Sequence, residues 1–149
     1  MDAQTDADLD ALRLSGITRV AGGFVAAAGF VGAVIVLQTV TSFRIRMPWL
    51  ALIWAILPLG LAGILFGMKI LGGRDWAAIG GLIVSLSLLL LDVLWSGYAL
   101  LNAVFVPMYV IAVILALGAS AATPFAIGEC RRASAARRRL HASGFETGL

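Results

Sequence analysis

Residues that carry redox, metal or hydrolytic chemistry are nearly absent from this sequence of 149 residues. One cysteine and one histidine occur, so neither an intramolecular disulfide nor a cysteine pair for quinone-linked oxidation can form. The histidine, His141, follows the last apolar run and cannot ligate a haem between membrane helices. The acidic residues form no cluster suited to hydrolysis or to metal binding. We therefore expect no enzyme, no metal site and no cofactor.

Charged side chains are also scarce. They make up 13% of the sequence, whereas 61% is hydrophobic, and soluble proteins average about 25% charged residues. The apolar residues form four runs, at about 20–40, 49–71, 76–98 and 103–127. Each run reaches the roughly 20 residues with which a helix crosses about 30 Å of hydrocarbon. The sequence predicts an all-α fold, a four-helix transmembrane bundle with short loops and antiparallel neighbours.

The runs divide the chain into three parts. Residues 1–19 form an N-terminal tail, 20–127 the membrane domain and 128–149 a basic tail. In the N-terminal tail, Thr5 followed three residues later by Asp8 suggests a helix start. We expect either a short helix on the membrane surface or a disordered tail.

The distribution of arginine and lysine predicts the orientation. Nine basic residues lie in the two tails and the second loop, whereas the other side has only Arg44 and Arg46. Because positive residues near span ends are retained in the cytoplasm, both termini should be cytoplasmic. Ten of the eleven basic residues are arginine, and alanine and glycine are abundant. This composition indicates a GC-rich bacterial genome, and hence a bacterial cytoplasmic (inner) membrane.

Asp92 is the only ionisable residue well inside a predicted span. A charge at the bilayer centre costs at least about 2.5–3.5 kcal/mol on insertion scales. Helical spacing places Asp92 on a stripe of small and polar residues that should face the bundle. The other members of this stripe are Gly81, Ser85 and Ser96.

Three roles for Asp92 remain open. It could bind a proton or a cation, or contact a partner subunit. It could also pair with Arg44 or Arg46 as a structural clasp near the outer headgroups. Gln38 ends the first span at the same level, so these residues form either a shallow polar vestibule or an ordinary polar span end.

Each span also carries a stripe of small residues, the pattern that lets membrane helices approach closely. The second span contains a GxxxG motif, and the stripes include Gly29, Ala33, Gly60, Gly63, Gly67 and Gly81. Most of these stripes should serve packing within the bundle. A stripe left on the outside would form a homo-oligomer or bind a membrane-complex partner.

The C-terminal tail contains five arginines directly beyond the last span: Arg131, Arg132, Arg137, Arg138 and Arg139. Such clusters attract anionic lipid headgroups. Nucleic acid is not expected as a partner, because neither a folded binding module nor interleaved aromatic residues accompany the arginines.

The sequence alone favours a non-enzymatic accessory or scaffold subunit of the membrane, packing through small-residue helix faces. The alternative is a small proton- or cation-coupled transporter, or an oligomeric channel, that uses Asp92.

Overall fold

The computed structural model describes residues 3–42, 49–101 and 106–142, with side chains over 5–40, 54–94 and 107–142. Every element in these ranges is a helix: α1 (Ala3–Ala11), α2 (Gly16–Ser42), α3 (Trp49–Leu71), α4 (Asp75–Leu101) and α5 (Val106–Ala142). Four of the helices, α2 to α5, are long and apolar enough to cross a membrane. The predicted all-α architecture with four candidate spans is confirmed.

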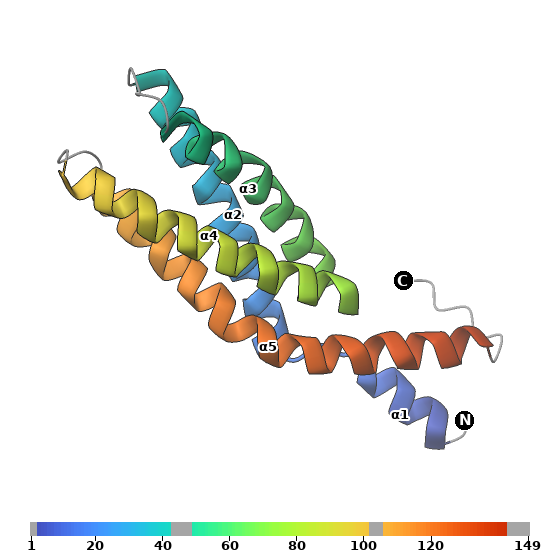
Figure 1. The fold of residues 1–149 in the computed structure, drawn as a ribbon. Coiled ribbons are helices and arrows are strands. Elements are labelled where there is room, and N and C mark those ends of the chain that lie inside the picture. The colour runs from blue at the N-terminus through green and yellow to red at the C-terminus, as the bar shows by residue number, and fades with distance from the viewer. Residues whose placement is uncertain (1–2, 43–48, 102–105, 143–149) are drawn as a thin grey trace.

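The four long helices form two hairpins that pack against each other, α2 with α3 and α4 with α5 (Figure 1). Helix α2 also contacts α5, and α3 also contacts α4, so the four helices close into a bundle. Helix α1 and the last turns of α5 lie at one end, which we call the terminal end (Figure 1). We call the opposite end, where α2 and α4 finish, the distal end.

Helices α2 and α3 approach so closely that side chains are excluded between them. A methyl group on Gly67 would lie 2.6 Å from the Gly22 carbonyl oxygen, and one on Gly60 would lie 2.7 Å from the Gly29 oxygen. Carbon atoms do not come this close to backbone oxygens, so only glycine fits at these positions. The GxxxG pattern of α3 therefore packs against the small residues of α2.

Large apolar side chains cover the outside of the bundle. More than half of the surface of Phe30, Leu65, Leu90 and Phe125 is exposed, although each belongs to a long helix. Inside, Ile56 and Leu88 belong to a core toward the distal end, and Val25 and Ile70 to a second core toward the terminal end. An apolar exterior around an apolar core is the pattern of a protein whose solvent is lipid.

Helix α5 continues well beyond the last predicted span. Its 37 residues correspond to about 55 Å, more than the hydrocarbon of a bilayer. The helix bends as it leaves the bundle (Figure 1), and Pro124 removes a backbone hydrogen bond in this region. Residues 128–142 of the predicted tail thus continue α5, and α1 packs against α5.

The glycine contact predicts a position-specific loss of stability. Gly29→Ala places a methyl group against the Gly60 carbonyl oxygen and 2.9 Å from the Ile64 nitrogen, so α2 and α3 must separate. Overpacking of this kind costs about 1–3 kcal/mol. We expect a lower melting temperature for this variant in detergent.

Gly23→Ala is the matched control, because it lies on the same helix and a methyl group there would meet nothing within 4 Å. This variant should melt at or slightly above the temperature of the wild type, since alanine favours helix. Equal melting temperatures for the two variants would contradict the close contact.

Candidate functional site

Asp92 lies in the interior of the bundle. Its side chain is 3% exposed, and Leu88, one helical turn earlier on the same face, is 1% exposed. Leu88 belongs to the core that also contains Val36 of α2 and Ile56 of α3. Helix α4 therefore turns its Asp92 face toward the other helices, away from lipid.

The carboxylate of Asp92 has no bonded partner in the described part of the chain. The ion pairs found there join other acids, Asp8, Asp10 and Asp75, to arginines at the terminal end. No hydrogen bond reaches Asp92 among the described residues. A buried carboxylate without a partner is energetically costly.

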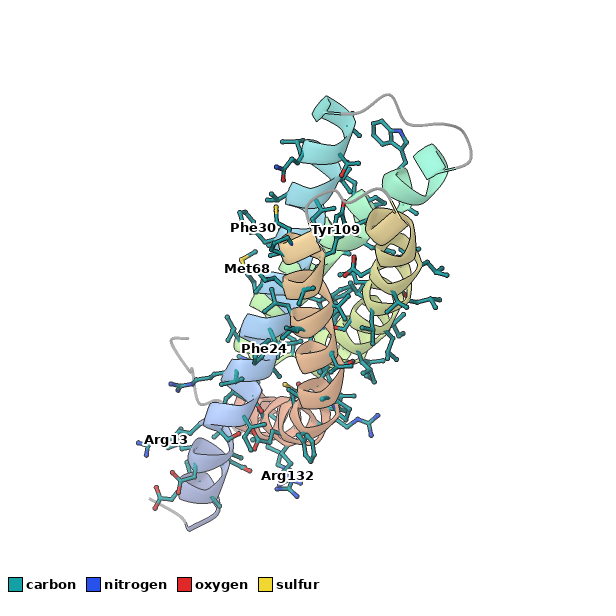
Figure 2. The ribbon with its side chains drawn as sticks, turned by 90° about the vertical axis from the view of Figure 1, so that its left-hand side faces the viewer. Arg13, Phe24, Phe30, Met68, Tyr109 and Arg132 are labelled. Atoms are coloured by element: carbon teal, nitrogen blue, oxygen red, sulfur yellow. The ribbon has the colours of Figure 1, made fainter. Side chains whose placement is uncertain are left out.

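A pair of hydroxyl groups marks the distal end of the same core. The Oγ1 atom of Thr39 on α2 and the hydroxyl of Tyr109 on α5 are 3.5 Å apart, and both side chains are buried. Tyr109 lies toward the distal end of the bundle in Figure 2. The pair connects the two hairpins across the interior.

Of the other residues predicted around Asp92, only Ser85 and Gln38 have side chains within the described part of the chain. Ser85 is buried, and its hydroxyl donates to the Gly81 carbonyl on the same helix. Gln38 is half-buried and has a bonded partner. Arg44 and Arg46 lie outside the described residues, as does the side chain of Ser96, so the predicted clasp with Asp92 remains a prediction.

Hydroxyl groups inside the long helices bond mainly to their own backbones. Ser87 donates to the Ile83 carbonyl, Ser120 to that of Leu117 and Thr123 to that of Ala119. Thr39 likewise donates to the Ile35 carbonyl. These bonds satisfy each donor without a second helix. Asp92 is the buried polar group of the spans that has no such bond in the described part of the chain.

The small-residue stripes lie inside the bundle. In α3, a methyl group on Gly63 would meet the Gly29 Cα atom at 3.1 Å. In the other hairpin, a methyl group on Gly81 would meet the Ile70 Cδ1 atom at 2.8 Å. The stripes of α4 and α5 include residues that are almost fully buried: Ala77, Ser85, Ala112, Ala116, Ala119 and Thr123. Internal packing therefore uses the faces that could have bound a partner.

A polar cluster at the terminal end joins α5 to the start of α2. The carboxylate of Glu129 accepts hydrogen bonds from the Thr18 hydroxyl and from the Ser15 backbone N–H, the latter at 3.2 Å. Hydrogen bonds from Thr18 and Ser15, with a smaller contribution from the Arg132 charge, hold the pKa of Glu129 below its ordinary value. Thr18 is fully buried.

The Glu129 cluster was not predicted from the sequence. The serine at position 15, three residues before Thr18, resembles a helix start, but nothing in the sequence relates it to a residue more than 100 positions away. The one hint in the sequence is that Glu129 is a single acidic residue just before the tail arginines.

The tail arginines, predicted to bind lipid headgroups, fall into two groups. Three of them contact the protein itself: Arg137 donates to the Gly72 carbonyl at 3.3 Å, Arg138 lies 3.9 Å from Asp75, and Arg139 lies 3.6 Å from Asp8. Arg131 and Arg132 are exposed and form no ion pair within the described residues.

Comparison of the chain with protein-family models, curated proteins and solved structures finds no significant match.

The Glu129 cluster predicts acid-dependent stability. Because the folded state lowers the pKa of this carboxyl, its stabilising contribution is present above the ordinary range of glutamate and is lost as the pH falls through the folded-state pKa. Glu129→Gln should lower stability by about 1 kcal/mol at neutral pH. Melting curves of both proteins should converge on acidification, because protonated Glu129 then resembles glutamine.

Asp10→Asn provides the control for this measurement. Asp10 pairs with Arg13 at 4.0 Å, but both side chains are more than four-fifths exposed, and exposed pairs contribute little. This variant should follow the wild type at every pH. A Glu129→Gln deficit that stays constant down to strongly acidic pH would argue against the ionised cluster.

Proposed function

We propose that the chain is a small proton-coupled membrane protein, either a transporter or an oligomeric channel, in which Asp92 binds the proton. The observation that carries this proposal is the Asp92 carboxyl, which is 3% exposed and has no bonded partner among the described residues. An ionisable group inside a membrane bundle is costly, and such groups commonly mark ion pathways and proton relays. The buried hydroxyl groups of Thr39, Ser85 and Thr123, in contrast, each bond to the backbone of their own helix.

A proton suits this site better than a metal cation does. Sodium, calcium or magnesium would need several oxygen ligands around the ion. Within the described ranges, no group of three or more acidic, histidine or cysteine side chains comes together. The buried hydroxyl groups of Thr39 and Ser85 already donate to their own helices. A carboxyl can take up a proton without any further ligand.

The helices around Asp92 offer few other titratable groups. Within α2 the only charged residue is Arg19, at its terminal end, and within α3 it is Lys69, also near the terminal end. Helix α5 contributes the phenol of Tyr109 to the shared core. A pH response from the middle of the bundle would therefore originate at Asp92.

The accessory or scaffold role is supported less well. It relied on a small-residue face left free for a partner, yet the predicted stripes of α2 to α5 pack against one another. A partner or a second copy would have to bind the large apolar side chains that cover the bundle. The partner-subunit role for Asp92 needs an accessible carboxyl, and this one is buried.

We further propose that the protein lies in a bacterial cytoplasmic membrane with both termini in the cytoplasm. Nine basic residues in the two tails and the second loop, against Arg44 and Arg46 between the first two spans of the sequence, support this orientation.

Replacement of Asp92 tests the proton site. Asp92→Asn keeps the shape of the carboxyl but cannot bind a proton. In proteoliposomes that contain a pH-sensitive dye, the wild type should move protons under a membrane potential, and the variant should fall to the level of protein-free vesicles. In infrared difference spectra after a pH jump, the carboxylic carbonyl signal of Asp92 should disappear in the variant. Asp75→Asn, at the terminal start of the same helix, should leave both readouts unchanged.

Thermal stability separates the proton site from the predicted clasp. If Asp92 is unpaired, Asp92→Asn should melt close to the wild type at neutral pH. If Asp92 pairs with Arg44 or Arg46, Asp92→Asn should lose several kcal/mol, about 3–5 for a buried pair, and Arg44→Glu or Arg46→Glu should reproduce the loss. Proton flux that is unchanged in Asp92→Asn would refute the proposed function.

The orientation can be measured with fusions at the C-terminus. A green fluorescent reporter, which matures in the cytoplasm, should be fluorescent, and an alkaline phosphatase reporter, which needs export, should be inactive. The opposite pattern would reverse the orientation of the bundle and place the distal end in the cytoplasm.

A further inference from the structure

The segment of α5 beyond the bundle has two opposite faces. Ala133, Ala136 and Leu140 are almost fully buried against the rest of the protein. Helical spacing places Arg131 and Arg138 on the opposite face and Arg132 and Arg139 between the two faces. The apolar face of this segment is thus covered by the chain itself, whereas Arg131, Arg132, Arg138 and Arg139 are exposed.

The five tail arginines differ in their partners within the protein. Arg138 and Arg139 pair with Asp75 and Asp8, and Arg137 bonds to the loop between α3 and α4. Arg131 and Arg132 are exposed and form no ion pair among the residues that the structure describes. Arg132 lies at the terminal end of the molecule, below the bundle in Figure 2.

Three other elements contribute exposed cations at the same level. Arg19 is in the first turns of α2, Lys69 is in the last turn of α3, and Arg74 is in the loop that follows. Contacts bring these elements together, since Thr18 bonds to Glu129 and the Ser134 hydroxyl bonds to the Gly73 carbonyl at 3.3 Å. The positive charges therefore gather at the terminal end of the bundle, on α2, α3, α5 and the loop after α3.

These cations border directly on the apolar exterior. Arg19 has Ile17 and Val20 as neighbours, which are 58% and 53% exposed, and Lys69 follows Met68, which is 55% exposed. Trp76 is also half-exposed at this level, and its ring meets the edge of Phe66 at a centroid distance of 5.8 Å. Tryptophan beside charged groups at the edge of an apolar surface is typical of the headgroup layer.

We propose that this cationic rim, formed by Arg19, Lys69, Arg74, Arg131 and Arg132, binds the headgroups of anionic phospholipids. The charges lie at the terminal end on α2, α3, α5 and the loop after α3, next to exposed apolar side chains, which is where phosphates of a bilayer lie. A soluble anionic protein or a nucleic acid would instead require the charges on one continuous face directed away from the apolar surface. The rim therefore matches a lipid surface, and it does not depend on the role of Asp92.

The test compares two arginine pairs on the same helix. Each protein is placed in nanodiscs of phosphatidylcholine with or without phosphatidylglycerol. Retained phosphatidylglycerol is then measured by native mass spectrometry, and the melting temperature in each lipid is measured in parallel. Arg131→Gln/Arg132→Gln should lower the preference for phosphatidylglycerol roughly 10-fold or more, as expected for two surface charges. Phosphatidylglycerol should also raise the melting temperature of this variant less than it raises that of the wild type.

Arg137→Gln/Arg138→Gln is the matched control, because it removes the same charge from arginines that contact the protein. It should keep most of the lipid preference, because these side chains already have partners in the protein, and it should change the melting temperature little, because exposed contacts contribute little. Each variant is compared with itself in two lipids, so a general loss of stability does not obscure the result.

Two results would overturn the proposal. The first is an unchanged lipid preference in Arg131→Gln/Arg132→Gln, and the second is an equal loss in the two double variants, which would indicate net charge rather than a rim. If the wild type keeps its preference for phosphatidylglycerol in excess inorganic phosphate, the rim binds the anion as part of a lipid. If inorganic phosphate displaces phosphatidylglycerol completely, the proposal of a lipid site is contradicted. Asp92→Asn should keep the lipid preference, so failure here is distinguishable from failure of the proton site.

Discussion

The backbone contact between α2 and α3 is the constraint on which the rest of the bundle depends. A methyl group on Gly67 would lie 2.6 Å from the Gly22 oxygen, so the two helices touch without side chains between them. In lipid, such contact replaces the hydrophobic driving force that is absent between apolar helices and apolar solvent. The close hairpin lets Leu88 of α4 reach a core that includes Ile56 of α3. The burial of Asp92, one turn further along α4, follows from this packing.

Much of the architecture was predictable because the hydropathy of a segment indicates whether lipid or water surrounds it. The apolar run at 49–71 coincides with α3, Trp49–Leu71. The same signal could not give the end of α5, since hydropathy falls at residue 127 while the helix continues to Ala142. The sequence also revealed small-residue stripes, but not which helix would meet which, because that depends on the rotation of each helix in the bundle.

The candidate site was predictable to the extent that it depends on one helix. The spacing of Gly81, Ser85 and Asp92 indicated an inward face, and both polar residues are buried. Contacts between helices distant in sequence were not accessible, and the Glu129 bond to Thr18 spans 111 positions. The division of the tail arginines was not accessible either, since Arg131 and Arg138 share one helix face and only Arg138 lies near Asp75.

The bonds between hydroxyl groups and their own helices also affect how the protein enters a bilayer. Thr39, Ser85 and Thr123 donate to carbonyl groups of their own helices. Each of these helices can therefore leave the translocon alone without an unsatisfied hydroxyl donor. Asp92 carries no such bond among the described residues. Helix α4 would leave the translocon with a polar group facing lipid unless α2 and α3 were already in place. The order of synthesis provides this arrangement, since the hairpin of α2 and α3 emerges first and α4 can then pack against it.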